Sequence, residues 1–97
     1  MKVIFTKQAE RDLEQIADFI AQDNPVRALS FIQEVEKKCL SIGDIPKAFL
    51  VVPELAEFGI RRRVYQSYSI FFSIQSDYSF IVRVLNSAMD YTALFES

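Results

Sequence analysis

The stretch AERDLEQIADFIAQDNPVRA, residues 9–28, decides the fold because it holds a helix, a corner and the start of a second helix. Apolar residues recur in it at helical spacing, and polar residues fill the other side of each turn. Asn24 is a favourable N-cap, and Pro25 is a favourable first helical residue because the N–H that proline lacks would have no helical partner there. We therefore predict helices from about Lys7 to Gln22 and from Pro25 onward, joined so tightly that they run as antiparallel neighbours.

The flanking residues extend this helical hairpin in both directions. Upstream, Lys2–Thr6 is β-branched and aromatic, which predicts a strand, and Thr6 is placed to cap the first helix. Downstream, the second helix continues to Gly43, which is placed to end it in a left-handed conformation. The apolar stripe of this second helix consists of Ala28, Ile32, Val35, Cys39 and Ile42.

The second half of the chain predicts a loop followed by strands. Asp44–Gly59 contains two prolines and no regular period, so we interpret it as a loop with a short strand or turn near Phe49–Val52. The links between the following strands are short enough for hairpins, and the residues from Met89 onward are expected to form one helical turn. The three expected strands are Arg61–Tyr65, Tyr68–Gln75 and Ser79–Asn86.

Together these elements predict an α+β fold in one domain, residues 1–97, with the order β-α-α-β-β-β. The N-terminal helical hairpin packs on one face of an antiparallel sheet. Tyr68–Gln75 is nearly apolar throughout, so it is expected to be the central strand. Because a helical hairpin covers only one face, we expect the other face to be partly open and apolar, or covered by a partner.

Composition and charge narrow the classes of function. The chain has no histidine and a single cysteine, Cys39, which we interpret as a buried structural thiol, so we expect no metal site and no cofactor. The net charge of −2 and a pI near 5.0 argue against direct, specific nucleic-acid binding. No apolar run is long enough to span a membrane and no stretch is typical of a signal peptide, so we expect a cytoplasmic protein.

Four stretches of the sequence resemble the ParE branch of the RelE/ParE superfamily of toxins from type II toxin–antitoxin modules. They are KQAERDLEQIADFIAQDNPVRALSFIQEVEKKC, IPKAF…PEL, IRRRVYQSYSIFFSI and IVRVLNSAMDYTALF, which together cover nearly the whole chain. The most specific part is the pattern A-x-x-D-L-x-x-I-A-x-x-I-A from Ala9 to Ala21, followed by Asn24-Pro25 and Ala28. The resemblance implies a RelE/ParE-like fold, an antitoxin that forms a hetero-oligomer with the chain, and one of two toxic activities.

The two activities are messenger RNA cleavage on the ribosome, as in RelE-like members, and poisoning of DNA gyrase, as in ParE-like members. The resemblance places the functional arginines of RelE-like toxins at Ser69 and near Ala88 or Met89, and a functional tyrosine near Phe95; none of these residue types is kept. A ribonuclease without histidine must work with Lys, Arg and Tyr alone. We therefore expect a gyrase inhibitor that acts by protein binding, without catalysis.

Two alternatives stay open beside gyrase inhibition. One is a ribosome-dependent endoribonuclease whose chemical groups are Arg61, Arg63, Arg83 and Tyr91. The other is a weakly toxic or decayed member that only binds its antitoxin.

Candidate contact residues fall into two groups. The first, for the target or the antitoxin, consists of Arg61, Arg63, Tyr65, Arg83, Tyr91 and Phe95. The second consists of Phe19 and Phe31, which belong either to the seam between the helices or to an antitoxin groove. The antitoxin is expected to be acidic where it meets Arg61–Arg63.

Two further arginine expectations follow from strand alternation and charge. Alternation places Arg62 with Val64 on the opposite face from Arg61 and Arg63, where we expect it to be solvated or paired with a helix acid. Arg83, expected on the same face as Ile81 and Leu85, should either pair with Asp90 or Glu96 or contact a partner.

Overall fold

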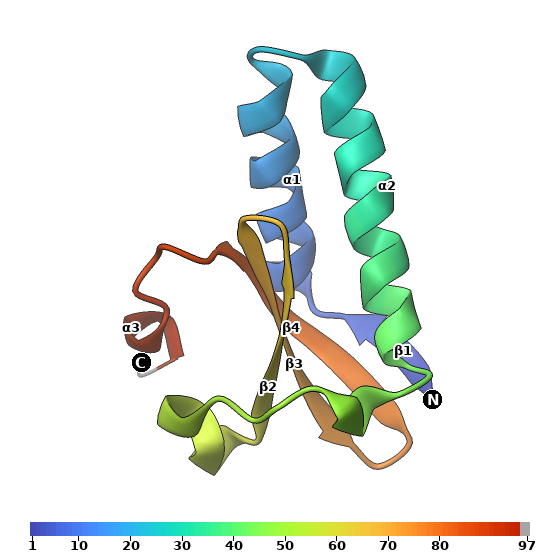
Figure 1. Ribbon diagram of the computed structural model, residues 1–97, viewed down its shortest axis with the longest axis vertical. Coiled ribbons are helices and arrows are strands. Elements are labelled where there is room, and N and C mark those ends of the chain that lie inside the picture. The colour runs from blue at the N-terminus through green and yellow to red at the C-terminus, as the bar shows by residue number, and fades with distance from the viewer. Residues whose placement is uncertain (96–97) are drawn as a thin grey trace.

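The structure is a computed structural model that describes residues 1–95, and it confirms the order β-α-α-β-β-β and the α+β class (Figure 1). Two short 3-10 helices, η1 (Pro46–Ala48) and η2 (Pro53–Phe58), lie where the sequence predicted a loop. The remaining elements are β1 (Lys2–Phe5), α1 (Lys7–Ala21), α2 (Pro25–Ile42), β2 (Ile60–Tyr65), β3 (Tyr68–Gln75), β4 (Tyr78–Asn86) and α3 (Thr92–Phe95).

Both predicted helix starts are confirmed by their capping bonds. The Thr6 hydroxyl accepts a hydrogen bond from the Ala9 N–H at 3.1 Å, and the Asn24 side-chain oxygen accepts one from the Arg27 N–H at 3.0 Å. Pro25 occupies the first position of α2. The two helices run antiparallel, and the tip of the hairpin extends past the sheet in Figure 1.

The sheet has the strand order β1-β4-β3-β2, so β3 and β4 both lie in its interior. Strands β2, β3 and β4 form the expected antiparallel meander. Strand β1 pairs with β4 in parallel, which makes the sheet mixed. A parallel partner requires a long crossover, and the helical hairpin between β1 and β2 provides the chain length for it.

The sheet has an apolar core on each face. The core under the hairpin contains Phe31, Val35, Ile70, Phe72 and Ile81. The core on the other face is covered by η2 and the C-terminal segment, which lie across the sheet from the hairpin (Figure 1), so the chain itself closes part of the face that was expected to be open. Near the end of β2 this face stays open and apolar, since Val64 is 57% exposed. The buried residues of this second core are Val52, Leu55, Ile60, Phe71 and Leu85, with Val82, Tyr91 and Phe95 packed against them.

Gly43 ends α2 for a different reason from the one predicted. Its φ of −60° is right-handed, so the left-handed cap is wrong. A Cβ at this position would lie 2.3 Å from the Met1 carbonyl oxygen and 2.9 Å from Val3 Cγ2. Glycine is therefore required because β1 passes directly against the end of α2. The glycine that needs a left-handed conformation is Gly59, with φ 67°, which ends η2.

Candidate functional site

Arg61 and Arg63 hold strand β2 to the end of α2 and to the loop that follows it. Arg63 Nη1 donates to the Lys38 carbonyl oxygen at 3.0 Å and to the Ser41 hydroxyl at 2.7 Å, and its guanidinium lies 5.0 Å from the Phe49 ring centroid. Arg61 Nη1 donates to the Phe49 carbonyl oxygen at 2.7 Å. For Arg63, a cation beside the last turn of a helix is favourable because of the helix dipole. Both arginines are thus engaged within the chain.

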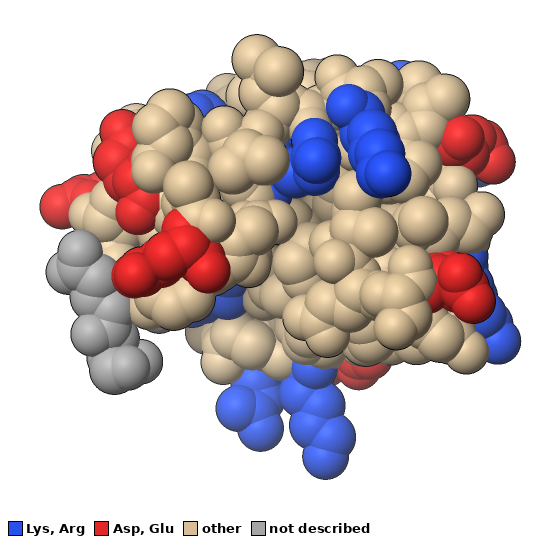
Figure 2. Space-filling view, turned by 90° about the horizontal axis from the view of Figure 1, so that it is seen from below, with Lys and Arg blue, Asp and Glu red and all other residues tan. Residues whose placement is uncertain are grey.

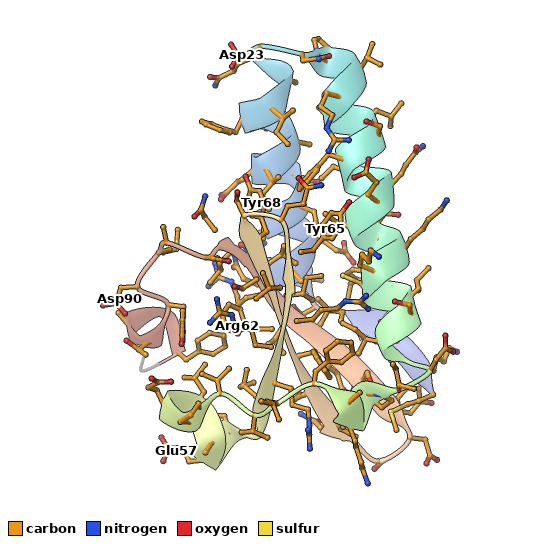
Figure 3. The ribbon with its side chains drawn as sticks, in the orientation of Figure 1. Asp23, Glu57, Arg62, Tyr65, Tyr68 and Asp90 are labelled. Carbon is orange, nitrogen blue, oxygen red and sulfur yellow. The ribbon has the colours of Figure 1, made fainter. Side chains whose placement is uncertain are left out.

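Arg62 lies on the opposite face of β2, as alternation predicted, but it is not paired with a helix acid. Its Nε donates to the Ser69 hydroxyl at 2.9 Å, and that hydroxyl is 2.8 Å from the hydroxyl of Ser87. Its guanidinium lies 5.8 Å from the ring centroid of Tyr91. Figure 3 shows Arg62 between the sheet and the C-terminal segment that carries Asp90. Among residues 1–95, no carboxylate forms an ion pair with Arg62.

A groove of about 480 Å³ lies beside Arg62 along the outer edge of β2. Its walls are mostly apolar, and Leu50 and Val64 are 83% and 57% exposed. Arg62 and Glu54 are the two charged residues that line it. The groove is lined by Leu50, Val51, Val52, Pro53, Glu54, Arg62, Val64 and Tyr91. We call this the Arg62 groove.

Arg83 pairs with Asp12 of α1, a partner that the sequence did not suggest. Arg83 Nε and Nη2 donate to Asp12 Oδ2 and Oδ1 at 2.8 and 3.0 Å, and Asp12 Oδ2 also accepts from the Val84 N–H at 3.0 Å. Asp12 is only 3% exposed. The expected pairing with Asp90 is therefore wrong, and Glu96, the other expected partner, lies outside the described residues.

The prediction that Arg83, Ile81 and Leu85 share one face of β4 is also wrong. The register of β3 and β4 shifts between Phe71 and Phe72, which pair with Arg83 and Ile81. Val82 is the extra residue of this β-bulge. The bulge breaks the simple alternation, so Ile81 belongs to the core under the hairpin and Leu85 to the opposite core.

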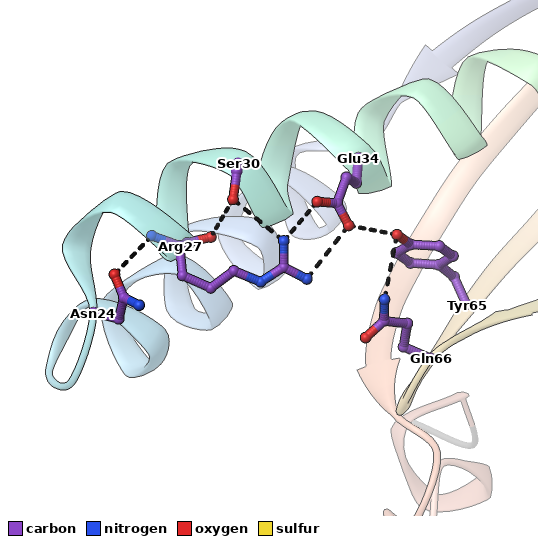
Figure 4. Close-up of polar contacts among 6 residues, drawn as sticks. All are labelled: Asn24, Arg27, Ser30, Glu34, Tyr65 and Gln66. Atoms are coloured by element: carbon purple, nitrogen blue, oxygen red, sulfur yellow. Dashed lines mark hydrogen bonds and ion pairs between the residues drawn. The ribbon is translucent and has the colours of Figure 1, made fainter.

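Tyr65 joins the end of the β2–β3 hairpin to α2 through Glu34. The Tyr65 hydroxyl donates to Glu34 Oε1, and Arg27 donates to both carboxylate oxygens of Glu34 (Figure 4). Arg27 also donates to the Ser30 hydroxyl at 3.2 Å, and Gln66 donates to the Tyr65 hydroxyl. The hydrogen bond to Glu34 raises the pKa of Tyr65, and the hydrogen bonds from Arg27 and then Tyr65 lower the pKa of Glu34.

We expect Glu34 to titrate below the ordinary glutamate range in a carboxyl-carbon NMR titration, and Arg27→Ala to move its pKa upward. Because the folded-state pKa is lowered, the stabilisation from this group is present above the unfolded-state pKa and is lost as the pH falls through the folded-state value. Lys7→Ala, which removes an exposed cation from α1, is the control and should leave the Glu34 titration unchanged. An Arg27→Ala curve identical to that of the wild type would contradict the assignment.

The remaining candidate aromatics lie in three different places. Tyr91 and Phe95 pack on Phe71, with ring centroids at 4.9 and 5.7 Å. Phe31 is buried under the hairpin and contacts Tyr65, so it does not line a surface groove. Phe19 is 68% exposed, and it lies outside the helix–helix seam at a depression of about 430 Å³ that Asp12, Tyr68, Arg83 and Met89 also line.

The Cys39 thiol and the arrangement of possible metal ligands limit the chemistry that these sites can perform. Burial raises the pKa of the Cys39 thiol to about 12, which agrees with a structural thiol. Residues 1–95 contain no group of three or more His, Cys, Asp or Glu side chains arranged to hold a metal ion. Over the same residues, no helix has the length and apolar character needed to cross a membrane. The arrangement offers fixed hydrogen-bond donors, the Arg62 guanidinium, which has no carboxylate partner among residues 1–95, and exposed apolar side chains.

Comparisons with known proteins agree with this fold. A family model described as the ParE toxin of the type II toxin–antitoxin system parDE matches residues 3–91. Among solved structures, a chain of the chromosomal ParDE TA system from P. aeruginosa aligns with a TM-score of 0.74 and 20% sequence identity, over 89% of this chain and 95% of that one. At this identity the structural likeness concerns the fold alone. No curated protein matches the chain.

Proposed function

Because the chain belongs to the ParE toxin family of type II toxin–antitoxin systems, we propose that it inhibits DNA gyrase by binding it, without catalysis, and is neutralised by a cognate antitoxin. A role without catalysis is supported by the arginines, which already form hydrogen bonds within the chain. Arg61 and Arg63 donate to backbone carbonyls, and Arg83 is bound to a buried carboxylate. Moving any of them onto a substrate phosphate would break contacts that hold the fold together.

The protonation states of the neighbouring groups support the same conclusion. A general base works best when its pKa lies near the working pH. The pKa values of Tyr65 and Cys39 are raised, so both side chains stay protonated near neutrality and are poor proton acceptors. Tyr91 packs on Phe71 beneath Arg62, an arrangement that serves a contact surface. The alternative ribonuclease set, Arg61, Arg63, Arg83 and Tyr91, is thus distributed over separate structural contacts.

Two assays run side by side test this proposal. Purified chain is added to a gyrase supercoiling reaction and to a ribosomal translation reaction in which messenger ends are mapped. We expect loss of supercoiling with intact messenger, and recovery of supercoiling when the cognate antitoxin is added first. Cleaved messenger with normal supercoiling would overturn the proposal in favour of a ribonuclease. No effect in either reaction, with tight antitoxin binding, would instead indicate a member that only binds its antitoxin.

A further inference from the structure

We propose that the Arg62 groove receives an extended, acidic and apolar segment of the antitoxin, which adds a short strand to the free part of β2. This inference rests on the proposed antitoxin partner and specifies where and how part of it binds. Three independent features of the groove support it: an open sheet edge, exposed apolar walls and a guanidinium that has no carboxylate partner within residues 1–95.

The open sheet edge begins where the chain's own pairing to β2 stops. Val52 N–H donates to the Ile60 carbonyl oxygen, and Arg62 N–H donates to the Leu50 carbonyl oxygen at 3.2 Å. Backbone groups of every second residue point to the same edge of a strand, so the N–H and C=O of Val64 point the same way as those of Arg62. Within residues 1–95, no backbone group bonds to Val64 on this side. An added strand would continue the pairing there.

The apolar walls of the groove supply the side-chain contacts that such a strand needs. Leu50 and Val64 are among the most exposed large apolar side chains of the described residues, and Val51, which also lines the groove, is 37% exposed. A strand that pairs with Val64 places alternate side chains against this surface. The occupant should therefore carry apolar residues at alternate positions.

The charged residues of the Arg62 groove indicate which polar group the occupant should carry. Of the three consecutive arginines, only Arg62 has both terminal guanidinium nitrogens without a recorded partner among residues 1–95. Its Nε is fixed by Ser69 and its plane by Tyr91, so the guanidinium is held in place before a ligand arrives. A fixed guanidinium favours a carboxylate that it can bind with two hydrogen bonds. Glu54 lines the same groove without pairing with Arg62, so the partner's carboxylate should lie on the side of the groove away from Glu54.

These features fit the antitoxin as the occupant of the Arg62 groove. Strand addition requires a partner whose own backbone groups are unpaired, which a flexible segment that folds on binding provides and the surface of a folded enzyme seldom does. The sequence predicted an acidic antitoxin surface facing Arg61–Arg63 in general. The structure narrows that expectation to Arg62, since its two neighbours are engaged within the chain.

Amide hydrogen exchange of the toxin, free and in complex with its cognate antitoxin, tests strand addition directly. We expect the Val64 amide to exchange quickly in the free chain and at least tenfold more slowly in the complex, because strand pairing protects it. The Asp77 amide, in the β3–β4 turn, is the internal control and should not change. Unchanged exchange at Val64 would overturn the proposal. Protection of Val64 by gyrase, or by self-association of the free chain, with none from the antitoxin would also overturn it.

Two pairs of variants separate the backbone bond from the charge in antitoxin binding measured by calorimetry. Val64→Pro removes the edge N–H and should weaken binding at least tenfold, whereas Val64→Ala keeps that N–H and should weaken it less. Arg62→Gln should also cost about tenfold or more, whereas Lys47→Gln, which removes an exposed charge outside the groove, should have little effect. Equal affinities for Val64→Pro and Val64→Ala would contradict strand addition. Thermal melts confirm that each variant is folded, and the result does not depend on whether the free chain inhibits gyrase.

Discussion

Replacing Asp12 with alanine is expected to lower the free energy of unfolding by about 3–5 kcal/mol, more than any other single change to a charged residue of this chain. The carboxylate accepts four hydrogen bonds, two from Arg83, one from the Val84 N–H and one from Gln8 Nε2 at 3.3 Å. The side chain of Arg83 is only 18% exposed, and arginine cannot lose its charge to escape the desolvated site. Removing Asp12 therefore leaves an unpaired cation and an unpaired backbone donor at the same place.

The position of Asp12 in the sheet explains why the effect should be large. Strand β1 covers the outer edge of β4 only as far as Ile81, where the Thr6 N–H donates to the Ile81 carbonyl oxygen. Beyond that point the edge of β4 is covered by α1, and Asp12 supplies the acceptor that a neighbouring strand would otherwise provide. The ion pair thus fixes the helical hairpin to the sheet at the end of the parallel pairing.

Denaturant and thermal unfolding of four variants check the explanation. For a chain of this size we expect Asp12→Ala to lower Tm by ~15 °C or more. Asp12→Asn, which keeps an acceptor oxygen, should lose less, and the double change Asp12→Leu with Arg83→Leu should be more stable than Asp12→Ala because no charge is left unpaired. Asp18→Ala, an exposed acid of the same helix, should stay within about 0.5 kcal/mol of the wild type. A loss below 1 kcal/mol for Asp12→Ala would contradict the role assigned to the pair.

The local features of the fold could be predicted from the sequence because short-range chemistry determines them. Periodicity located α1 and α2, and the capping preferences of Thr6 and Asn24 placed their first residues correctly. Alternation along β2 correctly separated Arg61 and Arg63 from Arg62. These predictions depend on residues within a few positions of one another, where the backbone geometry of helices and strands is nearly fixed.

The partners of the charged residues could not be predicted in the same way. Asp12 and Arg83 are 71 positions apart, and their contact depends on the parallel placement of β1 beside β4. The bulge at Val82 changes the face of the residues after it, and no local sequence signal such as a glycine marks it. The role of Gly43 depends on the passage of Met1 and Val3 and not on its own dihedral angles. Each miss involves a contact between distant segments.

Replacing Phe71 with alanine is expected to destabilise the chain by about 3–5 kcal/mol and, in addition, to release the C-terminal segment. Phe71 is fully buried on the face of the sheet opposite the hairpin, and Tyr91 and Phe95 both pack against its ring. Loss of the ring leaves a cavity and removes the surface on which the segment rests. The Ser87 N–H donates to the Ser67 carbonyl oxygen and ties the chain just after β4 to the β2–β3 turn, whereas the next backbone bond, from the Met89 N–H to the Asn86 carbonyl oxygen, is local and does not hold the segment on the sheet core.

Phe72 offers a matched control for this prediction because it is the same residue type, equally buried, on the other face of the same strand. Phe72→Ala should lower the free energy of unfolding by a similar amount, so cleavage through global unfolding contributes about equally in the two variants. Any faster chymotrypsin cleavage after Tyr91 in Phe71→Ala, under conditions where both variants are folded, then reports local release of the C-terminal segment. Equal cleavage rates in the two variants would show that the segment is held by contacts other than the Phe71 ring. A faster rate confined to Phe71→Ala would show that this part of the second core opens independently of the hairpin side of the sheet.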